Sequence, residues 1–275
     1  MTALRRLPVQ VLLGGIALLW LVPTFGLLLT SLLPPSVIQS DGWWTVLAEP
    51  RLVTLDNYRA MFADRQLVDA LVTTCVVAVG NTALLVLVSA LAGYAFAWLP
   101  FPGRDALFLV VVGLLVVPLQ VALIPIFSLY SATGLFDTAA GLILFHVAFG
   151  LPFGIFLLRN ALLEIPVEVI ESARLDGASE ARVFTQLILP LSRPAIAALA
   201  IFQFLFTWND LIVALTLGRA TQPLTVAIFA QLRQYGANID IIAPAAFISL
   251  AIPLAVFLSL QRAFTRGLLA GSTKG

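Results

Sequence analysis

Charged side chains are rare in this chain, and one group of them lies between Glu171 and Pro190, in the stretch ESARLDGASEARVFTQLILP. The stretch holds three acids and two arginines, and the apolar segments on both sides of it are long enough to cross a membrane. A charged, helix-forming insert in that position is a candidate for transmitting force from a soluble partner to a membrane-embedded body.

A second group of polar side chains, Trp208, Asn209 and Asp210, falls within a long apolar segment. An acidic side chain near the centre of a membrane helix costs about 2.5–3.5 kcal/mol, so Asp210 needs a partner, a cavity or a place near the surface. A helix starting at Pro194 would put Asp210 about 24 Å along its axis, in the outer part of the span. Two interpretations stand. Asp210 is an interfacial or helix-packing residue, or the group faces a wet cavity on a substrate pathway.

The residue patterns of common catalytic and metal sites are missing from the sequence. It contains no Gly-x-x-x-x-Gly-Lys-Ser/Thr loop for nucleotide phosphates, and its one histidine, His146, belongs to no His-Glu-x-x-His zinc motif. A lone histidine in an apolar helix is more often a packing or hydrogen-bonding residue than a ligand. The one cysteine, Cys75, rules out a disulfide within the chain. We therefore expect no enzyme activity, no metal site and no cofactor.

Composition sets the class of protein. Hydrophobic residues make up 61% of the 275 residues and charged residues 11%, against about 25% charged in soluble domains. The mean hydropathy is +1.05. These values predict an all-α, multi-pass membrane protein. A net charge of +1 argues against a nucleic-acid partner, which needs a concentrated basic patch.

Uncharged stretches, at about 20 residues per crossing, predict six transmembrane helices. The first has too long an apolar run for a cleaved signal peptide, so we expect an uncleaved helix. Pro118 and Pro125 are expected to kink the third. The predicted spans are Val9–Leu33, Ala70–Leu99, Ala106–Tyr130, Thr138–Leu158, Pro194–Leu217 and Ile241–Leu260.

The basic residues predict the orientation of the spans. Ten of the fifteen lie on the side that carries both termini and the Glu171 loop, and five lie on the other side. Because cytoplasmic loops are enriched in lysine and arginine, both termini and this loop are expected in the cytoplasm. The inverted topology remains the alternative, since five external arginines are not few. In the external loop, Leu55, Tyr58 and Phe62 have helical spacing and predict a short amphipathic helix on the membrane.

The Glu171 loop predicts two helices joined by a turn. Pro166 fits a first helical position, and Glu168 and Glu171 favour the positive end of the first helix. Gly177 is suited to the position just after its end. Ser179 is a natural N-cap for a second helix that is expected to run to Leu189.

Two sets of side chains give this hairpin two different surfaces. One set is small and would let another protein's groove approach closely: Ala173, Gly177, Ala178 and Ala181. The other set is apolar, has helical spacing and is expected to hold the second helix against the membrane body: Phe184, Leu187, Ile188 and Leu191. The alternative is that this hairpin is only an amphipathic connection between two spans, with no coupling role.

The same stretch resembles the EAA motif of ABC importer permeases, which reads Glu-x-Ala-x-x-x-Gly, nine residues, an aliphatic residue, one residue and Leu-Pro. The motif is filled by Glu171, Ala173, Gly177, Leu187, Leu189 and Pro190. Two positions depart from the family pattern, since Ser172 replaces an alanine and Leu187 an isoleucine. Both changes are small and preserve shape.

Other strings resemble the carbohydrate branch of this family. They are TLDNY from Thr54, FPGRD from Phe101, the Trp208-Asn209-Asp210 string, and the C-terminal QRAFTRGLLAGSTKG, which is similar to the end of the shorter maltose-type permease subunit. FPGRD alone also fits a plain Pro-Gly turn. The glycines of the tail predict an extended, bendable segment.

The resemblance implies a type I ABC importer permease fold, and it implies the division of the chain. Residues 1–69 would form the first helix and an external loop. Residues 70–265 would form a core of five helices with the cytoplasmic coupling hairpin 161–192, and residues 266–275 a cytoplasmic tail. The chain would be a non-catalytic, multi-pass subunit of a bacterial or archaeal cytoplasmic membrane.

The partners that the resemblance implies are a second related permease, a dimeric cytoplasmic ATPase, an extracytoplasmic solute-binding protein and a carbohydrate substrate. The hairpin residues implied to couple to the ATPase are Glu171, Ala173, Asp176, Gly177, Ala178 and Glu180. The implied ATPase-facing tail residues are Arg266, Gly267, Gly271 and Lys274. The alternatives are a secondary transporter or channel without an ATPase, which would need ionisable groups deep in several spans, and an intramembrane hydrolase.

Overall fold

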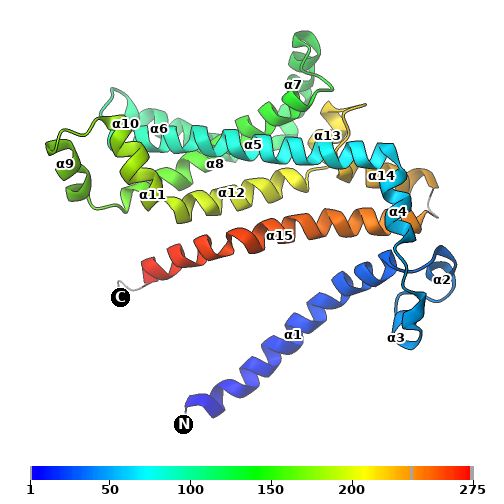
Figure 1. The fold of residues 1–275 in the computed structure, drawn as a ribbon. Helices are drawn as coiled ribbons and strands as arrows, with labels where there is room; N and C mark the ends of the chain where they lie inside the picture. Colours follow the sequence, from blue (N-terminus) through cyan, green and yellow to red (C-terminus); the bar gives the residue numbers. More distant parts are fainter. Residues whose placement is uncertain (1, 236–237, 273–275) are drawn as a thin grey trace. The chain divides into compact units, whose positions relative to one another are not determined.

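The computed structural model describes residues 2–235 and 238–272, and within these residues the chain forms helices and no strand (Figure 1). Among the described residues, four helices are long and apolar enough to cross a membrane, and two pairs of bent helices bring the number to as many as six if each pair is one span. The prediction of an all-α protein with several apolar spans is confirmed. The chain divides into two compact units, residues 1–71 with 224–252 and residues 72–223 with 253–275, which are described in turn.

Unit 1 contains the first apolar helix, a series of short helices after it, and the beginnings of two longer helices. Its elements are α1 (Thr2–Ser31), α2 (Pro35–Ser40), α3 (Thr45–Ala48), η1 (Pro50–Leu52), α4 (Asp56–Ala63), the start of α5 (Arg65–Trp98), α14 (Leu224–Tyr235) and the start of α15 (Ile239–Ser272). Its core is formed by Met61, Leu67, Ala70, Leu224, Ala227 and Ala245.

The end of α1 is fixed by residues of the TLDNY string. The Asn57 amide donates to the backbone oxygens of Ser31 (3.2 Å) and Leu33 (2.7 Å). Ser31 is the last residue of α1, where a helix leaves its carbonyls without partners, and Leu33 lies two residues beyond it. The Tyr58 and Ser31 hydroxyls lie 2.8 Å apart. The predicted short helix after Thr54 is confirmed as α4, and Leu55 and Phe62 beside it are more than half exposed.

Unit 2 is a bundle of helices with a hairpin at one end (Figure 1). Besides the rest of α5 and of α15 it contains α6 (Arg104–Gly113), η2 (Leu114–Val116), α7 (Leu119–Thr133), α8 (Ala139–Leu163), α9 (Val167–Leu175), α10 (Glu180–Arg182), η3 (Val183–Ile188), α11 (Leu189–Leu191), α12 (Arg193–Trp208) and α13 (Ile212–Leu217). Buried leucines and valines join α5, α8 and α12.

Two glycines on α8 allow close packing in this bundle. A Cβ at Gly150 would overlap Leu85 of α5 and the Gln203 side chain of α12, and a Cβ at Gly154 would overlap Ser89. Small residues of this kind let membrane helices approach closely and bring polar groups within bonding distance. Nearby, the Thr207 hydroxyl accepts from Asn81 (2.6 Å) and from Gln203 (3.4 Å).

The third predicted span is broken rather than kinked. The helices on either side of the break, Arg104–Val116 and Leu119–Thr133, differ in direction by 99°. Pro118 causes the break, because its ring disfavours a helical conformation at the preceding residue, and Val117 is extended (ψ 117°). Pro125 lies inside α7.

The prediction of a continuous fifth span from Pro194 to Leu217 is wrong. α12 ends at Trp208 and α13 begins at Ile212. The Asp210 carboxylate accepts hydrogen bonds from the backbone N–H groups of Val213 (3.2 Å) and Ala214 (3.0 Å). By satisfying donors at the start of α13, Asp210 stabilises a new helix start where the sequence suggested only an apolar run.

The C-terminal segment also differs from its prediction, because α15 continues through Gly267 and Gly271 to Ser272. Each glycine costs a helix about 1 kcal/mol relative to alanine. The leucines, alanines and arginines around them are strong helix formers, and the helix is propagated from a long segment that already exists.

Asp137 links two turns at the end of unit 2 away from the hairpin. Its carboxylate accepts from the backbone N–H groups of Arg219 (2.7 Å), Ala220 (2.9 Å) and Thr221 (2.9 Å), and its own N–H donates to Leu217 (2.9 Å). Burial would raise the pKa of Asp137, but these donors outweigh burial and lower the pKa below its usual value. Asp137 has a positive φ of 59°, a strained conformation that these bonds maintain.

Candidate coupling hairpin

The first hairpin helix, α9, ends in a complete C-terminal cap. Gly177 has a φ of +81°, as predicted for the residue after the helix end. Its N–H donates to the Arg174 oxygen (3.0 Å) and the Ala178 N–H donates to the Ala173 oxygen (3.0 Å). This pair of bonds defines the Schellman motif, in which the left-handed position favours glycine. The turn is therefore fixed by backbone geometry.

The second arm begins as predicted, with the Ser179 side chain accepting from the Arg182 N–H. It does not continue as an α-helix, however, because residues Val183–Ile188 form a π-helix and the Leu189 N–H donates to the Phe184 oxygen, five residues back. Pro190 explains the widening, since a proline in an α-helix clashes with the carbonyl four residues before it.

The wider turn changes which side chains face the bundle. Val183 and Ile188, five residues apart, are both 1% exposed in one cluster with Tyr94 and Leu162. Two side chains that are five residues apart point in well-separated directions on an α-helix. On the wider π-helix they point in nearly the same direction. Phe184 and Leu187 are partly buried as predicted. Leu191 was expected on the buried side and is instead 52% exposed.

An ion pair joins the two arms of the hairpin. Arg174 donates to Glu180 through Nε (2.9 Å) and Nη2 (3.2 Å), and Nη2 also lies 3.2 Å from the Trp98 backbone oxygen. The Tyr94 hydroxyl donates to the same carboxylate. The hydrogen bond to Glu180 raises the pKa of Arg174. The two-pronged Arg174–Glu180 contact has more geometric specificity than a single bond, and the bonds to Tyr94 and to the Trp98 oxygen fasten the hairpin to the end of α5.

Sequence reasoning selected Glu180 for contact with a partner, but it missed Arg174, Tyr94 and Trp98. Arg174 and Glu180 are six residues apart, a spacing with no meaning on a single helix. They meet only because the chain reverses at Gly177. The available signal was the opposite charge of two residues on either side of a predicted turn.

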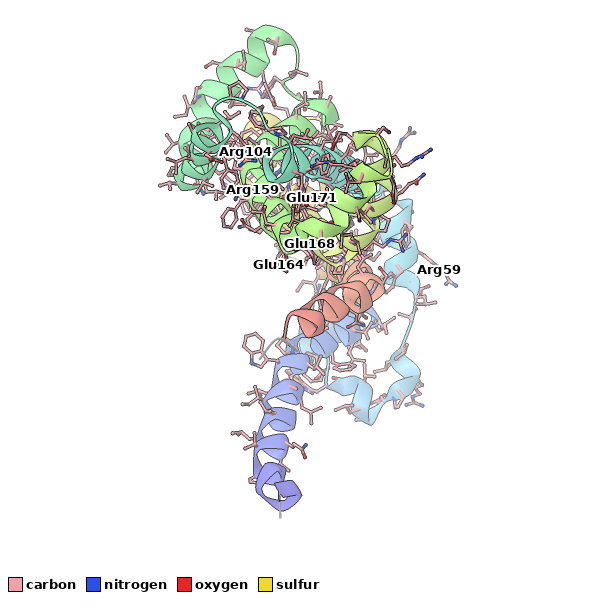
Figure 2. The ribbon with its side chains drawn as sticks, turned by 90° about the vertical axis from the view of Figure 1, so that its left-hand side faces the viewer. Arg59, Arg104, Arg159, Glu164, Glu168 and Glu171 are labelled. Carbon is pink, nitrogen blue, oxygen red and sulfur yellow. The ribbon has the colours of Figure 1, made fainter. Side chains whose placement is uncertain are left out.

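The remaining hairpin candidates lie together around the turn. Glu171, Asp176 and Gly177 are exposed, and Ala173 and Ala178 are half-buried against the same apolar cluster. Leu175, which the sequence did not single out, is 88% exposed. Figure 2 looks onto this end of unit 2, where Glu164, Glu168 and Glu171 are labelled. The tip therefore offers an apolar side chain beside acidic ones, with little side-chain bulk at the turn.

The candidate residues of the C-terminal tail belong mostly to the end of α15. Arg266, Gly267 and Gly271 fall within the helical residues of α15, and Lys274 lies outside the described residues. Their role toward a partner remains a prediction.

The Trp208-Asn209-Asp210 group is separated by the structure into three environments. Trp208 is 1% exposed and stacks on Phe204, with ring centroids 5.3 Å apart. Asn209 is exposed and donates to the Leu205 oxygen (2.8 Å). The Asp210 carboxylate caps α13 and lies 3.7 Å from the Nε2 atom of His146, which is almost fully buried on α8. The described residues contain no group of three His, Cys, Asp or Glu side chains that could hold a metal ion.

The fold and the hairpin define a multi-pass helical protein with a fixed, partly acidic turn between two of its apolar segments. Among solved structures, it is similar to a chain of a bacterial ABC transporter involved in the import of the acidic polysaccharide alginate. The TM-score is 0.79 at 20% identity, with 95% of this chain and 96% of the other covered.

Sequence comparison identifies the family. Residues 86–269 match the family described as "binding-protein-dependent transport system inner membrane component". The match covers more than half of the chain, and the chain belongs to this family as a multi-pass, non-catalytic membrane component.

Three curated permeases are similar along most of the chain. An osmoprotective compounds uptake permease of Synechocystis sp. is 44% identical, with 98% of this chain and 93% of the relative covered. An alpha-glucoside transport permease of Rhizobium meliloti is 47% identical, with 86% and 69% covered. A trehalose transport permease of Mycobacterium tuberculosis is 35% identical, with 93% of each chain covered.

Proposed function

We propose that this chain is the transmembrane subunit of an ATP-driven importer of carbohydrates or similarly hydroxylated small solutes. The observation that carries the substrate class is the similarity to permeases for alpha-glucosides and trehalose over most of the chain. The fixed hairpin turn supports the coupling role, because its exposed tip projects from a body that is otherwise apolar.

The proposed partners follow from the family and from the surfaces of this chain. A solute-binding protein would deliver the substrate, a second related permease would complete the pathway, and a dimeric ATPase would receive the hairpin. Movement of the hairpin would reach α5 through the Arg174–Glu180–Tyr94 contact, and α12 through Leu189–Leu191. ATP hydrolysis would take place on the partner chain.

Co-purification tests this proposal. The tagged chain, expressed with its chromosomal neighbours, is expected to bring down an ATPase subunit and to support ATP hydrolysis that a binding protein and sugar stimulate. Membranes that take up sugar through this chain alone, with no ATPase in the preparation, would instead indicate a secondary transporter or channel.

We further propose that the termini and the hairpin face the cytoplasm, on the basis of the ten-to-five distribution of basic residues. In a Cys75→Ala background, a cysteine replacing exposed Glu49 is expected to react with an impermeant thiol reagent added outside intact cells. A cysteine replacing exposed Asp176 is expected to react only after the cells are opened. The reverse pattern would establish the inverted topology.

For the substrate pathway, we propose that Asn209 is the member of the group that faces a wet cavity and that Asp210 supports it. Asn209→Ala is expected to change the sugar concentration for half-maximal uptake without lowering thermal stability. Asp210→Ala is expected to lower stability by about 1 kcal/mol, the usual value of a helix cap. Unchanged uptake parameters in Asn209→Ala would remove the group from the pathway.

A further inference from the structure

Arg159 carries a charge that no residue within the described structure neutralises. It lies near the end of α8 that leads to the hairpin, and its guanidinium sits over the Phe108 ring of α6, 4.0 Å from the centroid. Its Nε atom is buried and has no hydrogen-bond partner, and none of the ion pairs found in the described residues includes Arg159. The buried Nε–H group therefore lacks the acceptor that a donor shielded from water normally has.

An aromatic cluster fixes the position of this guanidinium. The Phe108 ring lies 5.6 Å from Phe96 and 6.4 Å from Phe156, and Phe96 lies 5.7 Å from Phe101 (centroid distances). An arginine held against an aromatic face keeps its planar N–H fork oriented for a two-pronged acceptor such as phosphate. The cluster therefore presents a positioned donor rather than a freely moving side chain.

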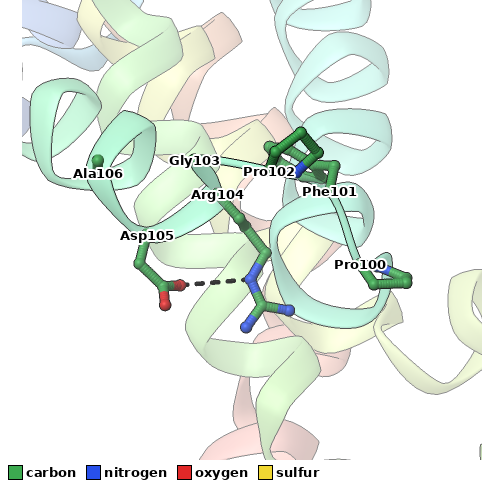
Figure 3. A pocket seen from close by; sticks show the side chains of 7 residues that line it. All are labelled: Pro100, Phe101, Pro102, Gly103, Arg104, Asp105 and Ala106. Atoms are coloured by element: carbon green, nitrogen blue, oxygen red, sulfur yellow. Dashed lines mark hydrogen bonds and ion pairs between the residues drawn. The ribbon is translucent and has the colours of Figure 1, made fainter.

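An open hollow of about 600 Å³ adjoins the same cluster through Phe101 (Figure 3). It is lined by residues 100–106 and includes Arg104, whose Nε atom bonds the Asp105 carboxylate (3.3 Å). That bond leaves the two Nη groups of Arg104 for other acceptors. Arg104 and Arg159 are at the same end of unit 2, the end that Figure 2 views.

The surface of α6 that continues from the hollow is apolar. Leu107 and Val110 of α6 and Leu114, the first residue of η2, are each at least half exposed, with 51%, 60% and 51% of their surface accessible. An amphiphile with an anionic head at the arginines would lay its acyl chains along these residues. The arrangement of a basic group at the boundary and apolar side chains toward the membrane interior matches a phospholipid in both parts.

We propose that Arg159, with Arg104 at the same end of unit 2, binds the phosphate of an anionic membrane phospholipid, seated at the start of α6. Basic pockets between transmembrane helices on the cytoplasmic side commonly hold such head groups. The assignment to the inner leaflet rests on the proposed orientation of the importer. The lipid site itself rests on the unpaired guanidinium, the aromatic cluster and the apolar surface of α6.

The test measures the phospholipid that stays with the assembled importer after exchange into an uncharged detergent, by mass spectrometry of the intact complex. Wild type is expected to retain phosphatidylglycerol or cardiolipin in preference to phosphatidylcholine. Arg159→Gln is expected to weaken retention about fivefold, the factor for about 1 kcal/mol per basic residue near a membrane surface. Arg159→Lys is expected to retain an intermediate amount, because lysine keeps the charge but loses the planar fork.

The matched control is Arg193→Gln, which removes an exposed arginine outside the aromatic cluster and is expected to leave retention unchanged. Inorganic phosphate at millimolar concentration is expected not to displace the lipid, since it offers no acyl chains to α6.

Equal retention in Arg159→Gln and wild type would overturn the proposal. So would loss of the second permease from the Arg159→Gln complex at unchanged lipid content, because the acceptor would then be a protein carboxylate. Retention is measured without ATP or sugar, so its outcome is separate from that of the proposed transport function.

Discussion

Replacement of Gly177 by valine is expected to stop uptake while the chain still inserts into the membrane. Gly177 has a φ of +81°, and no atom lies close enough to obstruct a Cβ there. The effect is therefore one of backbone strain, about 1–2 kcal/mol for a residue with a Cβ and more for a β-branched one. Strain of this size favours a rearranged turn about five- to thirtyfold and would remove the fixed tip that the ATPase is proposed to contact.

The measurement is binding-protein-stimulated ATP hydrolysis beside sugar uptake in proteoliposomes. Gly134→Val is the matched control, since Gly134 has a similar φ of +76°, has equally open surroundings and lies at the α7–α8 turn rather than in the hairpin. Gly177→Asn is expected to retain most activity, because asparagine tolerates this conformation. Wild-type hydrolysis and uptake in Gly177→Val would show that the hairpin is not the coupling element.

Reversal of the charge at Glu180 is expected to uncouple hydrolysis from uptake. Glu180→Arg would place two guanidinium groups together and leave the Tyr94 hydroxyl without its acceptor. Because both partners are partly exposed, the ion pair itself contributes about 1 kcal/mol or less. The expected result is therefore a small fall in thermal stability and about a fivefold loss of coupled uptake.

The double variant Arg174→Glu/Glu180→Arg restores opposite charges and is expected to recover part of the uptake. Tyr94→Phe removes only the third contact and separates its share from that of the ion pair. Arg174→Glu, Glu180→Arg and the double variant form a double-mutant cycle. If their effects on uptake were simply additive, a joint role of positions 174 and 180 would be disproved.

The helices of this protein could be read from its sequence because their signals are local. Long uncharged runs marked the apolar spans, and Ser179 and Gly177 marked a helix start and a helix end. The interruptions of the third and fifth predicted spans were harder to predict. Pro118 gave notice of a bend but not of its 99° size, and nothing in the sequence near Asp210 distinguishes a helix cap from an interfacial carboxylate.

The candidate site could be predicted in position but only partly in detail. The motif placed the hairpin between residues 171 and 190, and the structure keeps Glu171 and Gly177 exposed there. The contact of Glu180 with Arg174 and Tyr94 depends on a chain reversal and on the end of α5, so no local pattern encodes it. The π-helix before Pro190 was missed because an α-helical period was assumed across the proline.

The Asp137 contact has a consequence for how this protein tolerates sequence change. Its carboxylate is held by main-chain N–H groups at positions 219, 220 and 221, and every amino acid except proline supplies such a group. Positions 219 and 220 can therefore change their side chains while the loop keeps its geometry, and the constraint falls on Asp137 in a different turn and on Thr221, whose hydroxyl donates to the Asp137 backbone oxygen. In a saturation library, non-proline variants at Arg219 and Ala220 should survive selection for uptake, whereas Asp137 should accept few replacements.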